Sequence, residues 1–313
     1  MKLVTYRDAG NHGRAGVWTE HAIFDAAALL ERKDALDMNS LLRLGSHAIE
    51  DLRGQLANAA PDGPAAHPAH MADLLAPTPV PPSVRDFYAF EQHVKAARAR
   101  RNAEMIPEWY QIAVFYFSNP AAIQGPEADV PYPADSKELD FELEIAIVIG
   151  KEGRNIAAAD APQYIAGYMT MNDWSARDLQ REEMKMNLGP AKGKDFATSL
   201  GPWLVTPDEI EDRRLGSGAD ERYDLTMLGR INGNEISRGN FKDLYFTFPQ
   251  MIERASRHVT LKPGDVIGSG TVGTGCILEL GPENVPWLKT GDMVEMEIER
   301  LGILSNRIVE ERA

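Results

Sequence analysis

Apolar and polar positions along the chain predict many short strands and few long helices. Apolar runs at residues 2–6 and 15–20 are typical of strands, whereas residues 40–57 have the spacing of an amphipathic helix with Ser40 as its N-cap. Seven prolines lie between Asn58 and Ser83, and such chain favours an extended connection. The pattern therefore predicts a small N-terminal domain of residues 1–75 and a larger domain of residues 76–313.

The larger domain is predicted to begin with a helix. Ser83 and Asp86 form a capping pair for a helix that runs to residue 101. On such a helix Asp86 and His93, seven residues apart, share one face. A second helix is expected from Asp160 to Gly167.

The rest of the larger domain is predicted to consist mainly of strands. Residues 139–150 form an apolar, β-branched run, and Asn232-Gly233 between apolar positions predicts a hairpin. Few regular helical crossovers separate the strands, so the sequence predicts a β-rich α/β domain. Further strands are expected at residues 168–173, 266–271, 276–280 and 293–299.

Charge and composition narrow the class of function. The 313 residues include 33 basic and 47 acidic side chains, and the net charge of −14 repels nucleic acid and anionic membrane surfaces. The single cysteine, Cys276, excludes an intrachain disulfide and a zinc site built from several thiolates. No stretch resembles a signal peptide or a membrane helix. We therefore expect a soluble, cytoplasmic protein with neither a nucleic-acid nor a membrane partner.

Two glutamates in the apolar run at residues 139–150 are the first candidates for chemistry. Glu142 and Glu144 are two residues apart on a predicted strand, so their carboxylates project from the same face and repel each other. A solvated strand face is one explanation. The run is otherwise too apolar for an exposed edge, which favours the alternative of a hard-cation site with oxygen ligands.

Two aspartates extend this hypothesis. Asp173 ends the predicted strand at 168–173, and both Asp173 and Asp86 can alternatively serve as caps. Together with Glu142 and Glu144 they can supply several oxygens of an octahedral Mg²⁺ or Mn²⁺ site, or of a looser Ca²⁺ site.

His93 and Glu279 are candidates for a general base and its orienting carboxylate. A histidine beside Phe90 and Val94 is commonly a packed or surface residue, but an unpaired Glu279 within an apolar strand would be costly and needs a partner. A carboxylate that orients a histidine is the usual way to make a neutral base. Their pairing is a hypothesis at this stage. Lys194 and Thr198 lie in a loop rich in glycine and proline, where a lysine is usually solvated unless the loop faces a site.

Several stretches, taken together, resemble the fumarylacetoacetate hydrolase family. RDFYAFEQHV, DFELEIAIVIG, MNDWSARDLQ, GKDFATSLGPW and LKPGDVIGSGT occur in the family's order from near Ser83 to the C-terminus. The resemblance implies a mixed, rolled β-sheet domain of the fumarylacetoacetase C-terminal type, preceded by a small α+β domain. It also implies a homodimer.

The resemblance assigns roles to residues of this chain. It implies that Asp86, Glu142, Glu144 and Asp173 hold a divalent cation, Mg²⁺ first and Mn²⁺ or Ca²⁺ as alternatives, with Lys194 and Thr198 around it. It makes His93 the base, Glu279 its orienting residue and Lys194 a catalytic cation. The implied substrate-binding residues are Tyr88, Tyr116, Arg177, Gln180 and Thr271, together with an arginine that is Arg98, Arg100 or Arg101, of which we select Arg101.

The activity implied by the family is hydrolysis of a C–C bond in a ketonic acid. The expected substrate is a small 1,3-dicarbonyl (2,4-dioxo) acid, such as fumarylacetoacetate or an acylpyruvate. Water activated by His93 and Glu279 would attack one carbonyl, while the cation and Lys194 stabilise the enolate that leaves. A 2-oxo acid decarboxylase or isomerase on the same metal site is the alternative within the family. A noncatalytic protein stapled by Ca²⁺ is the alternative from another class.

Overall fold

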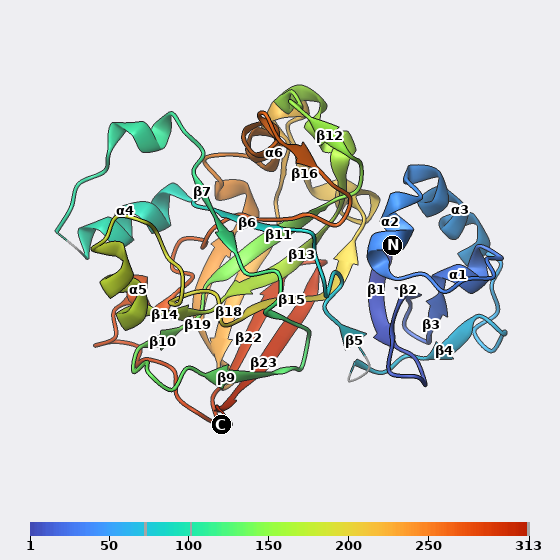
Figure 1. Cartoon of the computed structure of the whole chain (residues 1–313), viewed down its shortest axis with the longest axis horizontal. Coiled ribbons are helices and arrows are strands. Elements are labelled where there is room, and N and C mark those ends of the chain that lie inside the picture. Colours follow the sequence, from blue (N-terminus) through green and yellow to red (C-terminus); the bar gives the residue numbers. More distant parts are fainter. Residues whose placement is uncertain (72–73, 101, 312–313) are drawn as a thin grey trace.

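Two β-sheets dominate the computed structural model, which describes residues 1–71, 74–100 and 102–311 (Figure 1). The larger sheet runs in the order β4 (Ala66–Pro68), β3 (Ala22–Asp25), β2 (Gly13–Trp18), β1 (Lys2–Arg7), β15 (Thr198–Val205), β13 (Ile165–Asp173), β11 (Leu143–Ile149), β21 (Val266–Gly268), β6 (Val84–Phe87) and β7 (Phe115–Ser118), with β5 (Leu74–Leu75) paired to β1 and β8 (Ile123–Gln124) to β15. The smaller sheet runs in the order β19 (Asn234–Asn240), β18 (Thr226–Ile231), β22 (Met293–Ile298), β23 (Gly302–Glu310) and β9 (Asp129–Tyr132).

Helices and short strand pairs cover and connect the sheets. The α-helices are α1 (Ala26–Leu29), α2 (Met38–Arg43), α3 (Ser46–Leu56), α4 (Glu91–Ala99), α5 (Arg177–Met184), α6 (Phe248–Ser256) and α7 (Ile277–Leu280). The 3₁₀ helices are η2 (Pro107–Tyr110), η3 (Ala158–Tyr164), η4 (Pro207–Arg213), η5 (Gly218–Asp220) and η6 (Phe241–Asp243). The two-stranded pairs are β10 (Leu139–Asp140) with β14 (Ser175–Ala176), β12 (Gly153–Arg154) with β20 (Thr260–Leu261), and β16 (Arg214–Leu215) with β17 (Arg222–Tyr223).

The central strand β11 is buried on both faces. Leu143, Ile145 and Ile147 pack in the core shared with the smaller sheet, whereas Ala146 and Val148 pack in the core shared with the N-terminal helices. Burial of both faces explains why the sequence of this strand is almost continuously apolar.

The N-terminal strands continue the larger sheet. Strand β1 pairs with β15 in antiparallel register, with Lys2 opposite Val205 and Leu3 opposite Leu204. In Figure 1, α1–α3 lie on the opposite side of the molecule from α4 and α5. Strand pairing thus links residues 1–75 to residues 76–313, and the division between two domains at this point stays a prediction.

The hairpin and several strands expected from the sequence are confirmed. Strands β18 and β19 flank Asn232 and Gly233, which both have positive φ angles, as a tight two-residue turn requires. Strands are also present as β1, β2, β11, β13, β21 and β22.

The predicted start of the first long helix was wrong. Residues 84–87 form strand β6, and the helix α4 begins only at Glu91, with Phe90 as an N-cap that makes no side-chain hydrogen bond. Asp86 therefore lies on a strand and does not share a helix face with His93. Parallel pairing with β21, which aligns Val84 with Val266, holds this segment extended.

Other local expectations were also corrected. The helix expected at 40–57 is two helices, α2 and α3, divided at Gly45, and Asp37 rather than Ser40 caps the first of them. The helix expected from Asp160 to Gly167 is a 3₁₀ helix at residues 158–164, and Gly167 lies within the following strand β13. Residues 277–280, expected as part of a strand, form α7.

Among the described residues, no helix has both the length and the apolar character needed to cross a membrane.

Candidate active site

Four acidic side chains from separate parts of the chain meet at one end of the larger sheet. Asp86 comes from β6, Glu144 from β11 and Asp173 from the end of β13, while Glu142 directly precedes β11. One carboxylate oxygen of each lies within 4.8 Å of those of the others, and all four residues are buried. The structure thus brings together the four residues expected to bind a cation.

Two glycines make room for this cluster. Strand β21 lies between β6 and β11, and its Gly268 is opposite both Asp86 and Ala146. A Cβ on Gly268 would lie only 2.6 Å from Asp86 Oδ1. The backbone N–H of Gly270 donates to Asp86 Oδ1 at 3.2 Å and to Glu144 Oε2 at 3.0 Å. Gly268 therefore leaves space beside Asp86, and Gly270, two residues beyond the end of β21, supplies a backbone donor to the cluster.

A buried lysine and a tyrosine contact the same carboxylates. Lys194 Nζ lies 2.6 Å from both Glu142 Oε2 and Asp173 Oδ2, and the residue is only 3% exposed. Tyr116 donates its hydroxyl to Asp173 Oδ2 at 2.6 Å. Thr198 is the strand partner of Asp173, and its hydroxyl lies 3.3 Å from that of Ser118. Lys194 thus faces the site rather than solvent.

The electrostatic environments of the carboxylates differ. Burial, reinforced by neighbouring carboxylates, raises the pKa values of Asp86 and Glu144 well above their usual range, and burial also raises the pKa of Asp173. Burial acts in the same direction on Glu142, but Lys194 and Arg177 outweigh it and lower the pKa of Glu142. The pKa of Lys194 is raised because Asp173 and Glu142 outweigh its burial. The surroundings therefore favour the charged forms of both Glu142 and Lys194.

The donor set fits a divalent cation. Glu144 Oε1 and Asp173 Oδ1 are buried and make no hydrogen bond to the described residues, so each has a free acceptor position. Buried carboxylates that lack such partners are costly unless a cation offsets their charge. An all-oxygen site of this kind suits Mg²⁺, Mn²⁺ or Ca²⁺. Asp86, Glu142, Glu144 and Asp173 are the residues that would hold the ion.

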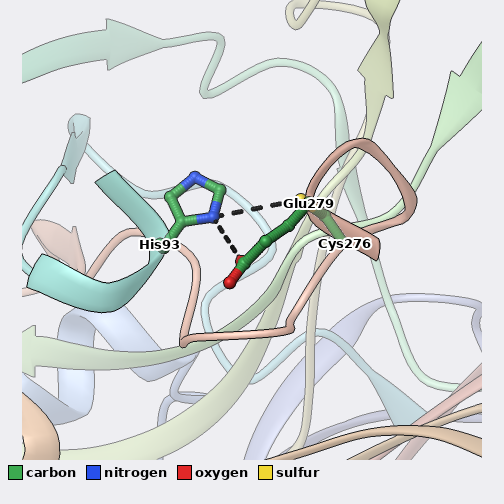
Figure 2. Close-up of side chains that lie close together, drawn as sticks. All are labelled: His93, Cys276 and Glu279. Carbon is green, nitrogen blue, oxygen red and sulfur yellow. Dashed lines mark hydrogen bonds and ion pairs between the residues drawn. The ribbon is translucent and has the colours of Figure 1, made fainter. Parts of the chain in front are cut away.

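Figure 2 shows a second group, in which His93 and Glu279 face each other. His93 Nδ1 lies 2.9 Å from Glu279 Oε2, and both side chains are 5% exposed. Glu279 Oε1 accepts the backbone N–H of Thr274 at 2.8 Å, so both carboxylate oxygens are used. Cys276 Sγ is 3.9 Å from the same histidine nitrogen. Because Nδ1 is engaged by Glu279, Nε2 is the ring nitrogen available as a base.

The histidine pair lies near the carboxylates. His93 is close enough to Glu142 to influence it electrostatically. Tyr88 contacts His93 edge-on, with ring centroids 5.5 Å apart.

The remaining residues predicted to bind substrate differ in burial and in their hydrogen-bond and ion-pair partners. Arg177 is buried and uses three nitrogens, donating to Asp140, Gln180 and Glu142. Thr271 is buried in the segment after β21. Arg98 donates to the carbonyl of Glu104, and Arg100 pairs with Glu283 at 2.7 Å. Arg101, our selected arginine, lies outside the described residues. The substrate contacts of these side chains stay predictions.

Sequence reasoning missed three participants. Asp140 is buried behind Arg177, Cys276 contacts His93, and Gly270 supplies the N–H shared by two carboxylates. Asp140 directly precedes the FELE segment, which was the available signal. The other two are recognisable only when the chain is folded.

Comparison with known proteins identifies the larger part of the chain. Residues 83–309 match the sequence model of the family described as "Fumarylacetoacetate (FAA) hydrolase C-terminal". Over 189 residues the chain is 36% identical to a mitochondrial oxaloacetate tautomerase of Homo sapiens. The matched stretch covers 60% of this chain and 56% of that protein. The chain thus spans little more than half the length of that relative.

Solved structures match over the whole chain. A fumarylacetoacetate hydrolase from Exiguobacterium antarcticum has a TM-score of 0.76 at 26% identity, covering 99% of this chain and 100% of that one. A maleylpyruvate hydrolase from Sphingobium sp. SYK-6, in complex with manganese(II) and pyruvate, has a TM-score of 0.73 at 26% identity and covers 100% of both chains. The expected fold, a mixed and β-rich α/β domain of the fumarylacetoacetase C-terminal type, is confirmed. The proteins that it matches include hydrolases and a tautomerase, and this chain belongs to the fumarylacetoacetate hydrolase family.

Proposed function

We propose that this protein is a hydrolase that cleaves a C–C bond in a small 2,4-dioxo acid of the acylpyruvate type and depends on a divalent cation. The hydrogen bond between His93 and Glu279 is the observation that carries this proposal. It pairs a buried imidazole with a carboxylate in the arrangement that a general base needs. Proton abstraction from water requires such a base.

The chain's own residues can accomplish each proton transfer. His93 Nε2 takes a proton from water while its Nδ1–H stays bonded to Glu279, and the water oxygen bonds to the acyl carbon. The bond from that carbon to the pyruvate CH₂ then breaks, and its electron pair passes into the 2-oxo unit. The protonated His93 returns the proton to the departing carbon. One water is consumed, and a carboxylic acid and pyruvate are formed.

Negative charge that develops on the 2-oxo unit must be stabilised in a buried site. A bound divalent cation supplies Lewis-acid stabilisation of the substrate's carbonyl oxygens. Lys194 is held at the same place by Glu142 and Asp173, so its ammonium is fixed before reaction begins. Tyr116 keeps Asp173 oriented through its hydroxyl.

The similarity to a maleylpyruvate hydrolase with bound manganese(II) and pyruvate supports this assignment. The similarity to an oxaloacetate tautomerase favours a second candidate, interconversion of the keto and enol forms of a 2-oxo diacid. In that reaction His93 would move a proton to or from the substrate carbon, and no water would attack.

Product analysis separates the two candidates. Purified protein with Mn²⁺ is incubated with acetylpyruvate, and pyruvate and acetate are quantified. In a parallel assay, the enol absorbance of oxaloacetate is followed. We expect equimolar pyruvate and acetate, with loss of turnover by about 100-fold or more in His93→Gln, because a base is removed. Mn²⁺ affinity should persist in this variant.

Two results would contradict this proposal. Keto–enol interconversion of oxaloacetate without release of pyruvate from acetylpyruvate would replace the hydrolase assignment with the tautomerase. Full hydrolysis by His93→Gln would refute the role of His93.

A further inference from the structure

Asp140 is a buried aspartate whose side chain accepts four hydrogen bonds. Its Oδ1 accepts the N–H groups of Phe141 at 2.9 Å and Ile277 at 2.7 Å. Its Oδ2 accepts the N–H of Leu278 at 3.0 Å and Nε of Arg177 at 2.8 Å. An ionised carboxylate has about four acceptor positions, so this set uses its full capacity.

In one direction, these contacts lead to the carboxylate cluster. Arg177 donates through Nε to Asp140 and through a terminal nitrogen to Glu142 Oε1 at 2.7 Å. The guanidinium is planar and rigid, so anchoring its Nε on Asp140 fixes the direction of the terminal nitrogen that meets Glu142. Arg177 forms ion pairs with both Asp140 and Glu142, so Asp140 shares with Glu142 the neutralisation of its charge.

In the other direction, the contacts lead to the histidine pair. The four-residue helix α7 begins after Cys276, whose side chain makes no capping hydrogen bond. Asp140 instead accepts the first two N–H groups of α7, those of Ile277 and Leu278. Glu279 lies on this helix and orients His93. The position of Glu279 therefore depends on an aspartate distant in sequence.

We propose that Asp140 is a positioning residue that sets the orientation of Glu142 and that of the His93–Glu279 pair together. This inference rests on the proposed function only in its significance for catalysis, which is that Asp140 fixes the position of the base relative to the cation site. Loss of Asp140 therefore disturbs both groups, although it touches neither His93 nor any substrate.

The first experiment is Asp140→Asn, read out in two ways. Whichever way the amide is turned, its NH₂ faces two N–H donors. We expect Mn²⁺ affinity, measured by titration calorimetry, to fall about tenfold or more, as happens when groups that orient metal ligands are lost. In metal-free protein labelled with ¹⁵N-histidine, the His93 imidazole signal, assigned by its absence in His93→Gln, should shift because its tautomer depends on Glu279.

Arg177→Lys separates the two effects. A lysine cannot bridge two carboxylates with a rigid fork, so Mn²⁺ affinity should again fall. The bonds from Asp140 to Ile277 and Leu278 remain, so the His93 signal should stay at its wild-type position.

Asp25→Asn is the matched control. Asp25 is also buried, accepts Arg14 Nε at 2.8 Å and caps a short helix through the N–H of Ala28 at 2.8 Å, but it lies on β3 in the N-terminal region. Its loss should lower the melting temperature and leave both Mn²⁺ affinity and the His93 signal unchanged.

The proposal is overturned if Asp140→Asn changes only the melting temperature, as Asp25→Asn does, or if only one of its two readouts moves. If Asp140→Asn does not fold, Arg177→Lys decides, and wild-type Mn²⁺ affinity in that variant overturns the proposal. Neither readout uses turnover, so a wild-type protein without hydrolase activity would refute the proposed function and leave this test intact.

Discussion

Both carboxylate oxygens of Glu279 have partners, and this arrangement determines which ring nitrogen of His93 carries the proton. Oε1 accepts the main-chain N–H of Thr274, and Oε2 faces His93 Nδ1. A main-chain N–H can only donate, so Oε1 must be an acceptor. The remaining oxygen thus favours the tautomer in which His93 carries its proton on Nδ1.

Glu279→Gln should reverse that tautomer. Thr274 requires the amide oxygen, which turns the NH₂ toward His93 Nδ1 and shifts the ring proton to Nε2. The base is then blocked, so kcat for acetylpyruvate should fall about 100-fold or more, with Mn²⁺ affinity unchanged. Steady-state kinetics and calorimetry measure the two quantities.

Cys276→Ala is the control for this variant. Its Sγ also contacts His93 Nδ1, but at 3.9 Å and as a weak partner. Its kcat should stay within about threefold of wild type. Wild-type kcat in Glu279→Gln would contradict the role given to Glu279.

At the scale of elements, the strand that carries Asp86 shows what local pattern cannot supply. The sequence around Ser83 has the features of a helix start, yet residues 84–87 pair with β21, about 180 residues later in the chain. The pairing depends on β21 offering Gly268, which leaves space for the Asp86 side chain. Asp86 and His93 were thus selected as candidates from the sequence, but the shared helix face predicted for them was wrong.

The helix α7 was missed for a related reason. CILEL is a short, mostly apolar run like a buried strand, and four residues are too few for helical spacing to show. The hydrogen bonds that Asp140 makes to Ile277 and Leu278 fix its first turn, and Asp140 precedes it by more than 130 residues. Only the tertiary structure contains this information.

The hairpin between β18 and β19 was predictable because its signal is local. Gly233 has a φ of 78° and open space around its Cα, so Gly233→Ala should cost about 1 kcal/mol through backbone strain alone. Gly54, in the helix α3, also has open space, and Gly54→Ala should instead stabilise the protein by about 0.5–1 kcal/mol. Urea denaturation measures both changes, and equal signs would contradict this explanation.

At the scale of the whole molecule, the acidic cluster links metal binding to stability. Four buried carboxylates face only Lys194 and Arg177 as buried positive partners among the described residues, so the metal-free protein contains like-charge repulsion. A cation that binds only the folded state adds about 2.7 kcal/mol at 100 times its Kd.

Glu144→Gln should therefore affect the melting temperature in opposite directions in the metal-free and the metal-bound protein. Without metal, its melting temperature should equal or exceed that of wild type, because an uncharged amide replaces a buried carboxyl whose ionised form is strongly disfavoured at this position. The increase that Mn²⁺ causes in wild type should largely disappear. Thermal denaturation with Mn²⁺ and with EDTA measures both, and Glu235→Gln on the exposed hairpin is the control. Identical melting of wild-type protein in Mn²⁺ and in EDTA would contradict the cation site.

The pairing of β1 with β15 has a consequence for the polypeptide as a whole. Strand β15 also pairs with β13, which ends at Asp173, so a continuous ladder of backbone hydrogen bonds runs from the first residues to the acidic cluster. A fragment starting after the proline-rich segment would leave β15 unpaired at Leu204 and Val205, and an open strand edge is the kind of surface through which chains aggregate. The N-terminal region therefore covers the edge of β15 at Leu204 and Val205.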